Sequence, residues 1–348
     1  MHRHKNLFDQ VCSLENMHAA AIETLRGKRS KPAGTRFLCR IEDEIVDLCR
    51  EIDTGVYRHG GYNYFTITDP KERLVAAAGF RDRVVHHAIV RVIEPIFEKR
   101  FIEDSFACRR GKGTHAAMRR ALHFTRRYPY ALKCDVAKYF ASVDHATLTG
   151  LLERVIGDKR LMDLIRNVLE SHTDGVRREW KPGGGLFDIT EHTLGLPIGN
   201  LTSQFFANVY LNPLDHFIKH VLRVRGYVRY MDDFILFGDS PAQLRDWGRG
   251  VKAFLQSLML HMHPKKYRLM PTARGVDFAG FVLFSDGRVR VRSSTVKRFD
   301  RRFKRMLWEM RTKRRQASDI TQRVQAWTAH TLHAQSYGLR KSVLMGRA

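Results

Sequence analysis

Hydrophobic positions follow two different periodicities along this chain. From Leu7 to Leu25 apolar residues recur at spacings of three, four and seven, which predicts one amphipathic helix. Similar helical patterns cover residues 42–53 and 83–97, whereas residues 62–69 alternate and predict a strand. Helices and strands are mixed without a regular βαβ alternation, so the pattern predicts an α+β fold.

Two predicted β-segments in the middle of the chain stop at acidic residues. The apolar run "YALKC" ends at Asp135. Residues 227–238 form two apolar arms around Asp232 and Asp233, the pattern of a β-hairpin with carboxylates at its tip. Three acidic side chains at the ends of apolar strands are candidates for chemistry.

The C-terminal part of the chain is strongly basic. Residues 276–291 predict a further hairpin around Asp286-Gly287, and residues 289–316 are dense in Arg and Lys. Within this segment apolar residues keep helical spacing, namely Val296, Phe299, Phe303, Met306 and Met310. The pattern favours a helix that packs on one face and lies along a nucleic-acid backbone with the other; an ordinary solvated helix is the alternative.

Composition narrows the class of partner. The 348 residues carry a formal charge of +25, with a pI of about 10.2, which favours nucleic acid over a membrane surface as the binding partner. No apolar run approaches the roughly 20 residues of a membrane span. The start "MHRHKNLFDQ" lacks the apolar core of a signal peptide, so we expect a cytoplasmic protein with no membrane partner.

Cysteine and histidine usage does not indicate a zinc site. The number of cysteines is odd and no CxxC pair occurs, so reduced thiols are expected. His261 and His263 form an HxH pair, but no third ligand lies nearby in the sequence, which disfavours a metal site there.

The acidic residues at the strand ends favour a divalent cation. Adjacent acids at a packed sheet edge repel each other, and a metal ion removes the conflict. Magnesium takes oxygen ligands and often binds one or two carboxylates together with substrate phosphates. Two such ions about 3.5–4 Å apart can clamp the attacking and leaving oxygens of a phosphoryl transfer. Asp135, Asp232 and Asp233 would supply the carboxylates.

The segment "YMDD", Tyr230 to Asp233, resembles the signature of reverse transcriptases. Further blocks similar to those of the family follow one another in the expected order: "KERLVAAAGFRDRVVHHAI", "FACRRGKGTHAA", "KCDVAKYFASVDH", "LPIGNLTSQFFANVYL", "LHMHPKKYRLM" and "VDFAGFVLF". The resemblance covers roughly residues 30–340. It implies an RNA-directed DNA polymerase with a right-hand fold of fingers, palm and thumb.

The resemblance also implies a domain organisation. An N-terminal helical extension (1–30) precedes the fingers (31–130), and the palm is divided into a first part (131–150) and a second part (193–287). The remaining segments are a fingers/palm insertion (151–192) and a basic helical thumb (288–348).

Roles at the reaction centre follow from the same resemblance. Asp135 and Asp232 would hold two Mg²⁺ ions, with Asp233 assisting and the carbonyl of Val136 as a further ligand.

Nucleotide binding is implied at several other positions. Lys71 and Arg73 fall where the family's fingers hold the triphosphate of the incoming dNTP. Phe140 matches the aromatic gate that excludes a 2′-hydroxyl, although a plain core phenylalanine would give the same letter. Lys266 would protonate pyrophosphate, with Lys265 as a competitor for this role.

Nucleic-acid contacts are implied in the palm and thumb. Phe281 and its neighbours would support the primer end, and Gln204 belongs to a block that contacts nucleic acid. The thumb would grip the RNA–cDNA duplex through the basic residues Arg298, Arg301, Arg302, Lys304 and Arg305.

One block points to a subgroup of the family. Retroviral and group II intron enzymes typically have glutamine where Ile198 precedes Gly199, and Pro where Gln204 follows Ser203. Both departures resemble the reverse transcriptases of diversity-generating retroelements. These copy a template-repeat RNA into cDNA with errors at adenines and work with a small basic helical accessory protein. An isoleucine cannot make the hydrogen bond of a glutamine, worth about 0.5–1.5 kcal/mol; the alternative is that Ile198 only packs beneath the nucleotide.

Two other functions fit the same motifs. One is an antiphage reverse transcriptase of the abortive-infection or unknown-group kind. The other is a catalytically inactive, maturase-like RNA-binding protein, which the intact acidic residues disfavour.

Overall fold

The computed structural model describes residues 3–68, 72–180 and 189–346, which form two compact units. The first unit comprises Met1–Ile102, Val136–Phe217 and Lys252–Met262. The second unit comprises Glu103–Asp135, Ile218–Val251 and His263–Ala348. Each unit is therefore built from segments that lie far apart in the sequence.

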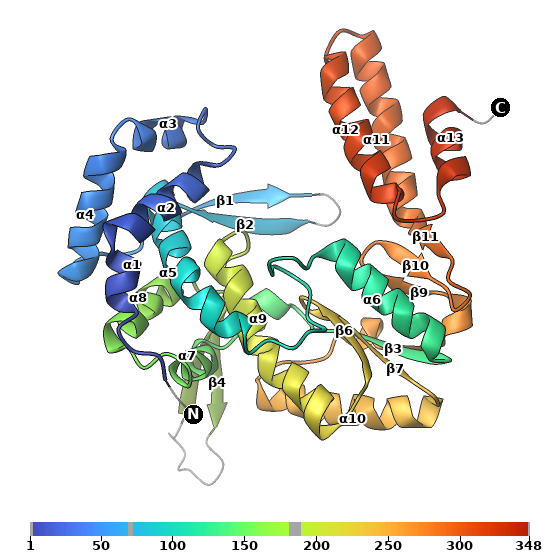
Figure 1. Ribbon diagram of the computed structural model, residues 1–348, viewed down its shortest axis with the longest axis horizontal. Coiled ribbons are helices and arrows are strands. Elements are labelled where there is room, and N and C mark those ends of the chain that lie inside the picture. Colours follow the sequence, from blue (N-terminus) through green and yellow to red (C-terminus); the bar gives the residue numbers. More distant parts are fainter. Residues whose placement is uncertain (1–2, 69–71, 181–188, 347–348) are drawn as a thin grey trace. The chain divides into compact units, whose positions relative to one another are not determined.

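Helices make up most of the first unit (Figure 1). They are α1 (Phe8–Cys12), α2 (Leu14–Leu25), α3 (Pro32–Leu38), α4 (Ile41–Asp53), α5 (Phe80–Glu98), α7 (His145–Glu153), α8 (Lys159–Glu170) and α9 (Leu201–His216), with the 3-10 turn η1 (Tyr139–Ser142). Helix α5 packs against both α2 and α9. The helices predicted over residues 42–53 and 83–97 are confirmed.

The single helix predicted from Leu7 to Leu25 is wrong, because the chain breaks at Ser13. This residue is extended, with φ −61° and ψ 139°, and its side-chain oxygen accepts a hydrogen bond from the backbone N–H of Asn16 at 3.2 Å. Serine is a favoured N-cap because it satisfies an amide that the first helical turn leaves unpaired. Two helices, α1 and α2, replace the predicted one.

Two hairpins extend from the helices of the first unit. Strand β1 (Tyr62–Ile67) pairs antiparallel with β2 (Arg73–Ala78), which confirms the strand predicted there over the described part. Strand β4 (Gly175–Trp180) pairs antiparallel with β5 (Ile189–Leu194).

The second unit is built on an antiparallel sheet with the order β6-β7-β3-β8. Its strands are β6 (Gly226–Tyr230), β7 (Asp233–Gly238), β3 (Tyr130–Asp135) and β8 (Arg268–Pro271). A second sheet contains β9 (Val276–Phe278), β10 (Phe281–Leu283) and β11 (Val289–Val291). The hairpin predicted around Asp286-Gly287 is β10–β11, and β9 adds a strand to it that the sequence pattern did not separate.

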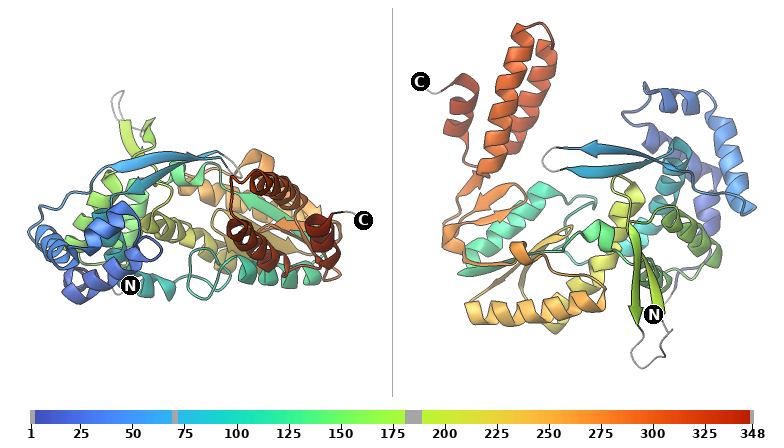
Figure 2. Two further views of the ribbon diagram at one scale, coloured as in Figure 1. Left: turned by 90° about the horizontal axis from the view of Figure 1, so that it is seen from above. Right: turned by 180° about the vertical axis from the view of Figure 1, so that it is seen from behind.

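Alternation along the strands divides the four-stranded sheet into two faces. Ala131 and Ile235 belong to the cluster that packs under α6 (Thr114–Arg127), which crosses one face of the sheet in Figures 1 and 2. Leu132 points to the other face, where a side chain on Gly248 of α10 (Pro241–Ser257) would meet it. Residues two apart on β3 therefore share a face, so Lys133 lies on the same face as Ala131 and Asp135.

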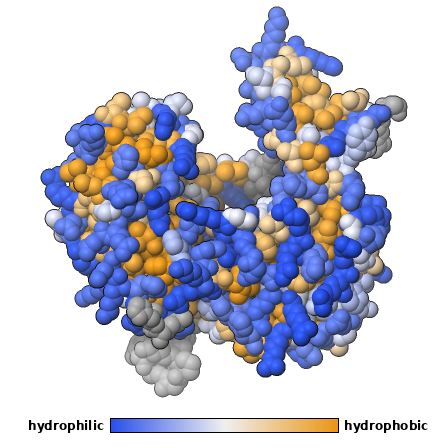
Figure 3. All heavy atoms as spheres, in the orientation of Figure 1, coloured by the Kyte–Doolittle hydropathy of each residue, from blue (hydrophilic) through white to orange (hydrophobic). Residues whose placement is uncertain are grey.

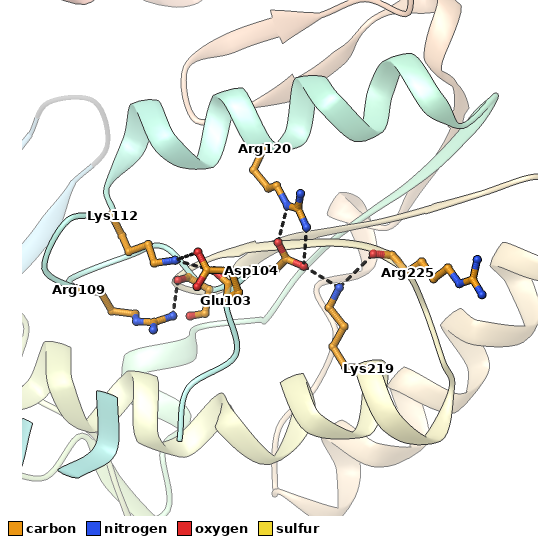
Figure 4. A network of polar contacts seen from close by, with 8 residues as sticks. Glu103, Asp104, Arg109, Lys112, Arg120, Lys219 and Arg225 are labelled. Atoms are coloured by element: carbon orange, nitrogen blue, oxygen red, sulfur yellow. Dashed lines mark hydrogen bonds and ion pairs between the residues drawn. The ribbon is translucent and has the colours of Figure 1, made fainter. Parts of the chain in front are cut away.

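The edge strand β6 is covered by a segment that precedes α6. The N–H of Arg229 donates to the carbonyl of Asp104 at 2.9 Å, and the N–H of Phe106 donates to the carbonyl of Arg229 at 3.0 Å. The buried carboxylate of Asp104 is held by Arg120 Nε at 2.6 Å and by Lys219 Nζ at 2.7 Å (Figure 4). Charge pairing fixes this segment against the sheet edge.

Three helices follow the sheets: α11 (Ser293–Arg311), α12 (Ala317–Thr331) and α13 (Tyr337–Met345). The apolar stripe of α11 packs as predicted, since Phe303 and Met306 are buried with Ile320 of α12. The rings of Phe299 and Trp327 stack with centroids 4.1 Å apart. Hydrophilic residues lie beside hydrophobic ones over these helices (Figure 3).

None of the helices in the described ranges combines the length and the apolar character that a membrane crossing requires.

Candidate active site

The two sheet aspartates are direct cross-strand neighbours. Asp135 ends β3, Asp233 begins β7, and the two residues pair with each other in the antiparallel register. Their side chains therefore lie on the same face. Like charges that are directly opposite destabilise a sheet, so this pair needs a compensating cation.

Lys133 supplies one such cation. It lies two residues before Asp135 on β3 and therefore shares its face. Its Nζ is 3.0 Å from Oδ2 of Asp233 and donates to the carbonyl oxygen of Asp277 at 2.7 Å. One ammonium group thus joins the tip of the β6–β7 hairpin to β9.

Lys266 supplies the second cation. Its Nζ lies 2.6 Å from Oδ2 of Asp135. The lysine is carried by the 3-10 turn η3 (Pro264–Lys266), and the N–H of His263, just before this turn, donates to the carbonyl of Asp135 at 2.8 Å. The N–H of Lys265 donates to His263 Nδ1, so this histidine caps the turn. The two lysines thus offset part of the carboxylate repulsion for which the sequence predicts a metal ion.

The pKa of Asp233 is raised to about 6 from the ordinary value of 3.8. Burial is the main cause, because it penalises the charged form. The ammonium of Lys133 opposes this rise, while the charges of Asp135 and Asp232 add to it. The ionised form of the Asp233 carboxyl is therefore not fully stabilised by the protein groups around it.

The remaining aspartate lies in a strained turn. Met231, between the two hairpin strands, has a φ of 58° in the left-handed region, and half-buried Asp232 follows it. Arg229 of β6, which is fully buried, donates from Nη1 to the carbonyl of Met231 at 3.1 Å. A buried guanidinium thus supports the backbone of the turn that carries Asp232.

This arrangement fits a divalent cation. Oδ1 of Asp135 and Oδ1 of Asp233 are buried, and neither has a hydrogen-bond partner among the described residues. Buried polar atoms without a partner are costly, and a metal ion would satisfy both. In the ranges that the structure describes, no three His, Cys, Asp or Glu side chains converge closely enough to hold an ion alone. Magnesium does not require this, since it usually completes its shell with water and substrate phosphates.

The aspartates lie in a region that matches a known family. Residues 68–283, more than half of the chain, match the family described as reverse transcriptase (RNA-dependent DNA polymerase). The chain belongs to the reverse transcriptase family.

Curated relatives of this reverse transcriptase come from several kinds of organism. Protein YkfC of Escherichia coli is 27% identical over 263 residues, which are 70% of this chain and 66% of YkfC. Nuclear intron maturase 1, mitochondrial, of Arabidopsis thaliana is 32% identical over 157 residues, 44% of this chain and 22% of the maturase. Group II intron-encoded protein LtrA of Lactococcus lactis is 24% identical over 180 residues, 51% of this chain and 28% of LtrA. The chain thus spans about two thirds of YkfC and less of the other two.

The fold also resembles a solved polymerase. Apo telomerase from Candida tropicalis superposes with a TM-score of 0.50 at 10% identity, covering 68% of this chain and 49% of that chain. This likeness confirms the α+β polymerase fold that the sequence motifs implied.

The loop before α9 in the reverse transcriptase is fixed to β2. The N–H of Ala76 donates to the carbonyl of Ile198 at 3.0 Å, and Asn200 Nδ2 donates to the carbonyl of Ala76 at 2.8 Å. Between them Gly199 has a φ of 115°, and a Cβ on it would lie 2.7 Å from Cγ1 of Val75. Glycine is required here both by the backbone conformation and by the close approach of β2.

Other predicted nucleotide contacts lie in the first unit. Exposed Arg73 begins β2, and half-buried Phe140 lies in η1, where its carbonyl accepts from the N–H of Leu196 at 2.8 Å. Val136, whose carbonyl was predicted as a metal ligand, also belongs to this unit; it is buried, and its backbone pairs with that of Met262. Lys71 lies outside the described residues.

The predicted nucleic-acid contacts differ in exposure. Phe281 is fully buried, and its ring centroid lies 4.6 Å from that of His330, so it supports the surface from beneath and does not present its ring to a ligand. Gln204 is half-buried in the first turn of α9. On α11, Arg298 is half-buried, while four predicted residues are exposed: Arg301, Arg302, Lys304 and Arg305.

Sequence reasoning missed Lys133 and Arg229. Both residues lie within otherwise apolar strands, where a charged side chain is almost never buried unless it is paired. Their positions in the sequence therefore indicated that each has a partner in the fold.

Proposed function

We propose that this reverse transcriptase is an RNA-directed DNA polymerase that works by two-metal-ion nucleotidyl transfer. The observation that carries the proposal is the directly opposed pair Asp135 and Asp233, each with a buried oxygen that has no hydrogen-bond partner among the described residues. Asp232 completes the acidic set at the adjacent turn. An inactive RNA-binding relative would not need to keep these buried charges, which cost stability.

The residues of the site would divide the work between them. Asp135, Asp232, Asp233 and the Val136 carbonyl would hold two Mg²⁺ ions, which lower the barrier by stabilising charge on the attacking and leaving oxygens. The ammonium group of Lys266 lies beside the Asp135 carboxylate, where the metals would bind. It would donate a proton to the departing pyrophosphate.

The incoming dNTP would be bound by residues of the first unit. Lys71 and Arg73 would bind the triphosphate of the dNTP, and Phe140 would exclude a 2′-hydroxyl. Ile198 and Gly199 would lie against the incoming nucleotide.

The template and product would be held elsewhere. Gln204 would contact the nucleic acid, and Phe281 would support the primer end from below. The basic face of α11 would follow the backbone of the RNA–cDNA duplex. In this assignment residues 31–130 form the fingers, 131–150 and 193–287 the palm, and 288–348 the thumb.

The finer proposal is mutagenic copying in a diversity-generating retroelement. Ile198 and Gln204 support it, since they depart from other subgroups in the same block. An apolar side chain removes one hydrogen bond that would position the nucleotide, which relaxes selection by up to about tenfold. Such an enzyme would copy a template-repeat RNA and use a small basic helical accessory protein.

The test is Mg²⁺-dependent dNTP incorporation on a primed RNA. Asp232→Asn and Asp135→Ala should each lower incorporation by about a thousandfold or more, because the metals lose a ligand. RNA affinity should stay at the wild-type value. Asp246→Asn, an exposed change on α10, is the control and should incorporate normally.

Two outcomes would contradict the proposal. Substantial synthesis by either variant would exclude these carboxylates from catalysis. A wild-type protein that binds RNA tightly and incorporates nothing would favour a maturase-like function, in keeping with the names of the intron maturase relatives.

A further inference from the structure

A surface pocket lies at the end of the four-stranded sheet that is opposite to the acidic hairpin. Its volume is about 350 Å³. It is lined by Phe237 near the end of β7, by Tyr128 just before β3, and by residues around them. Since β3 has six residues that rise about 3.3 Å each, roughly 17 Å of strand separates the pocket from Asp135. The pocket is therefore distinct from the candidate active site.

Three arginines line this pocket. Arg127 comes from the last turn of α6, and Arg223 and Arg225 come from the loop before β6. All three are exposed, and none forms an ion pair within the described part of the chain. Asp239 is the acidic residue of the lining, so the pocket carries an excess of two positive charges.

The loop holds its arginines in a fixed arrangement. Lys219 Nζ donates to the carbonyl of Arg225 at 3.0 Å, while the guanidinium of Arg225 points away from this network (Figure 4). Arg223 has a φ of 53°, a left-handed conformation that is unfavourable for a residue with a side chain. The N–H of Val224 donates to the carbonyl of Ile218 at 3.0 Å and helps to hold this turn. A position that would suit glycine carries an arginine instead.

Aromatic rings stand beside the arginines. Tyr128 and Trp247 both line the pocket, and the guanidinium of Arg127 lies 5.9 Å from the Tyr128 ring centroid. A Cβ on Gly226 would lie 2.8 Å from both Tyr128 and Phe237, so glycine allows the strand to close the pocket. Guanidinium groups that bind phosphates, next to rings on which bases stack, are typical of single-stranded nucleic-acid sites.

We propose that this pocket is a second RNA-binding site, which holds a single-stranded segment of the RNA that is not being copied. The arginines would bind its phosphates, and a base would stack on Trp247 or Tyr128. The Asp239 carboxylate would accept a hydrogen bond from a 2′-hydroxyl or a base N–H. The inference rests on the proposed function to the extent that RNA is the substrate. The aromatic rings favour RNA over an acidic protein segment, which would use the arginines alone.

The test compares two triple variants with equal loss of charge. Arg127→Gln/Arg223→Gln/Arg225→Gln removes the pocket arginines. The control carries three substitutions on the exposed face of α10: Arg245→Gln, Arg249→Gln and Lys252→Gln. The probe is an unstructured 30-nucleotide RNA, titrated from low to high salt, and thermal melting of each variant checks the fold.

The pocket variant should lose RNA affinity where the control does not. Three single-strand phosphate contacts contribute about 0.7 each to the slope of log affinity against log salt, so the slope should fall by about 2. At 0.15 M salt the same loss corresponds to about fiftyfold in affinity, and about tenfold if the contacts are partial. With RNA bearing 4-thiouridine, wild-type protein should crosslink at Tyr128 or Trp247.

Several results would overturn the proposal. Equal affinity and slope in the two variants, or crosslinks only at other sites, would exclude an RNA site here. Loss of binding to poly-L-glutamate without loss of RNA binding would assign the pocket to an acidic protein.

Incorporation at saturating primed RNA should be equal in both variants. If the wild type incorporates nothing, the proposed function fails while the binding comparison still decides the pocket.

Discussion

Replacing Lys133 with methionine should raise the pKa of Asp233 further. Lys133 Nζ is 3.0 Å from Asp233 Oδ2, and methionine keeps most of the side-chain volume without the charge. Burial and the neighbouring aspartates would then act on Asp233 without opposition. The ionised carboxylate, which is the form that binds a metal, becomes harder to reach at neutral pH.

The size of the effect follows from the geometry. Two unit charges 3.0 Å apart attract by about 5 kcal/mol at an effective dielectric constant of about 20. The side chains of Lys133 and Asp233 are 14% and 26% exposed, so solvent weakens the attraction towards the roughly 1.5–3 kcal/mol of a charged hydrogen bond. At about 1.4 kcal/mol per pH unit this is a rise of about one to two units. The pKa of about 6 should become about 7 to 8.

The assay is a carboxyl titration of metal-free protein by NMR, with ¹³C-labelled aspartate and Asp233→Asn to assign the signal. Because the folded protein holds this proton more tightly than the unfolded chain, the group stabilises the fold fully below pH 3.8. That contribution is lost as the pH rises through about 6. In Lys133→Met the loss should come one to two pH units later. The Mg²⁺ concentration for half-maximal synthesis should rise about twofold to tenfold at pH 7, as the ionised fraction of Asp233 falls, and approach the wild-type value by pH 9.

Lys252→Met, an exposed change on α10, is the matched control and should leave both measurements unchanged. An unshifted Asp233 titration in Lys133→Met would refute the electrostatic reasoning. A Mg²⁺ requirement raised equally at every pH would show that the lysine acts on geometry and not on charge.

Three further changes test other parts of the structure. Ile198→Gln should lower misincorporation opposite template adenine several-fold, because it restores one hydrogen bond; cDNA sequencing checks this, and an unchanged error rate in an active variant would mean that Ile198 only packs. Gly199→Ala should lower the free energy of unfolding by about 1–3 kcal/mol, since its Cβ would lie 2.7 Å from Val75; an unchanged Tm would contradict this. Arg229→Met should lower kcat by about tenfold or more with RNA affinity unchanged, because the turn at Met231 loses a charged hydrogen-bond donor; steady-state kinetics with a wild-type kcat would exclude this support.

The parts of the site that could be predicted from the sequence are local. The hairpin that carries Asp232 and Asp233 follows from alternation within twelve residues, and the strand ending at Asp135 from a short apolar run. Neither pattern contains the register between the two strands, which are about a hundred residues apart. The direct opposition of Asp135 and Asp233 therefore became visible only in the structure.

The errors have the same physical origin. Ser13 falls on the polar side of the helical pattern, so the periodicity alone predicted one continuous helix. The preference of serine for the start of a helix was the signal against it. The motif assigned Phe281 to the primer end but not its full burial, because the ring packs against His330, 49 positions away. The positive charges of Lys133 and Lys266 were visible, but their partners were set by tertiary packing.

The segment around Asp104 has a consequence for the design of a shorter version of this reverse transcriptase. An open strand edge is a template on which further chains can pair and aggregate. On β6 the backbone of Arg229 is occupied by Asp104 and Phe106, whose position depends on Arg120 and Lys219. A minimal fragment designed to begin at β3 would lose this cover and leave the strand beside the Asp232 turn open. Such a fragment should retain the segment together with α6, so that the edge of β6 stays covered.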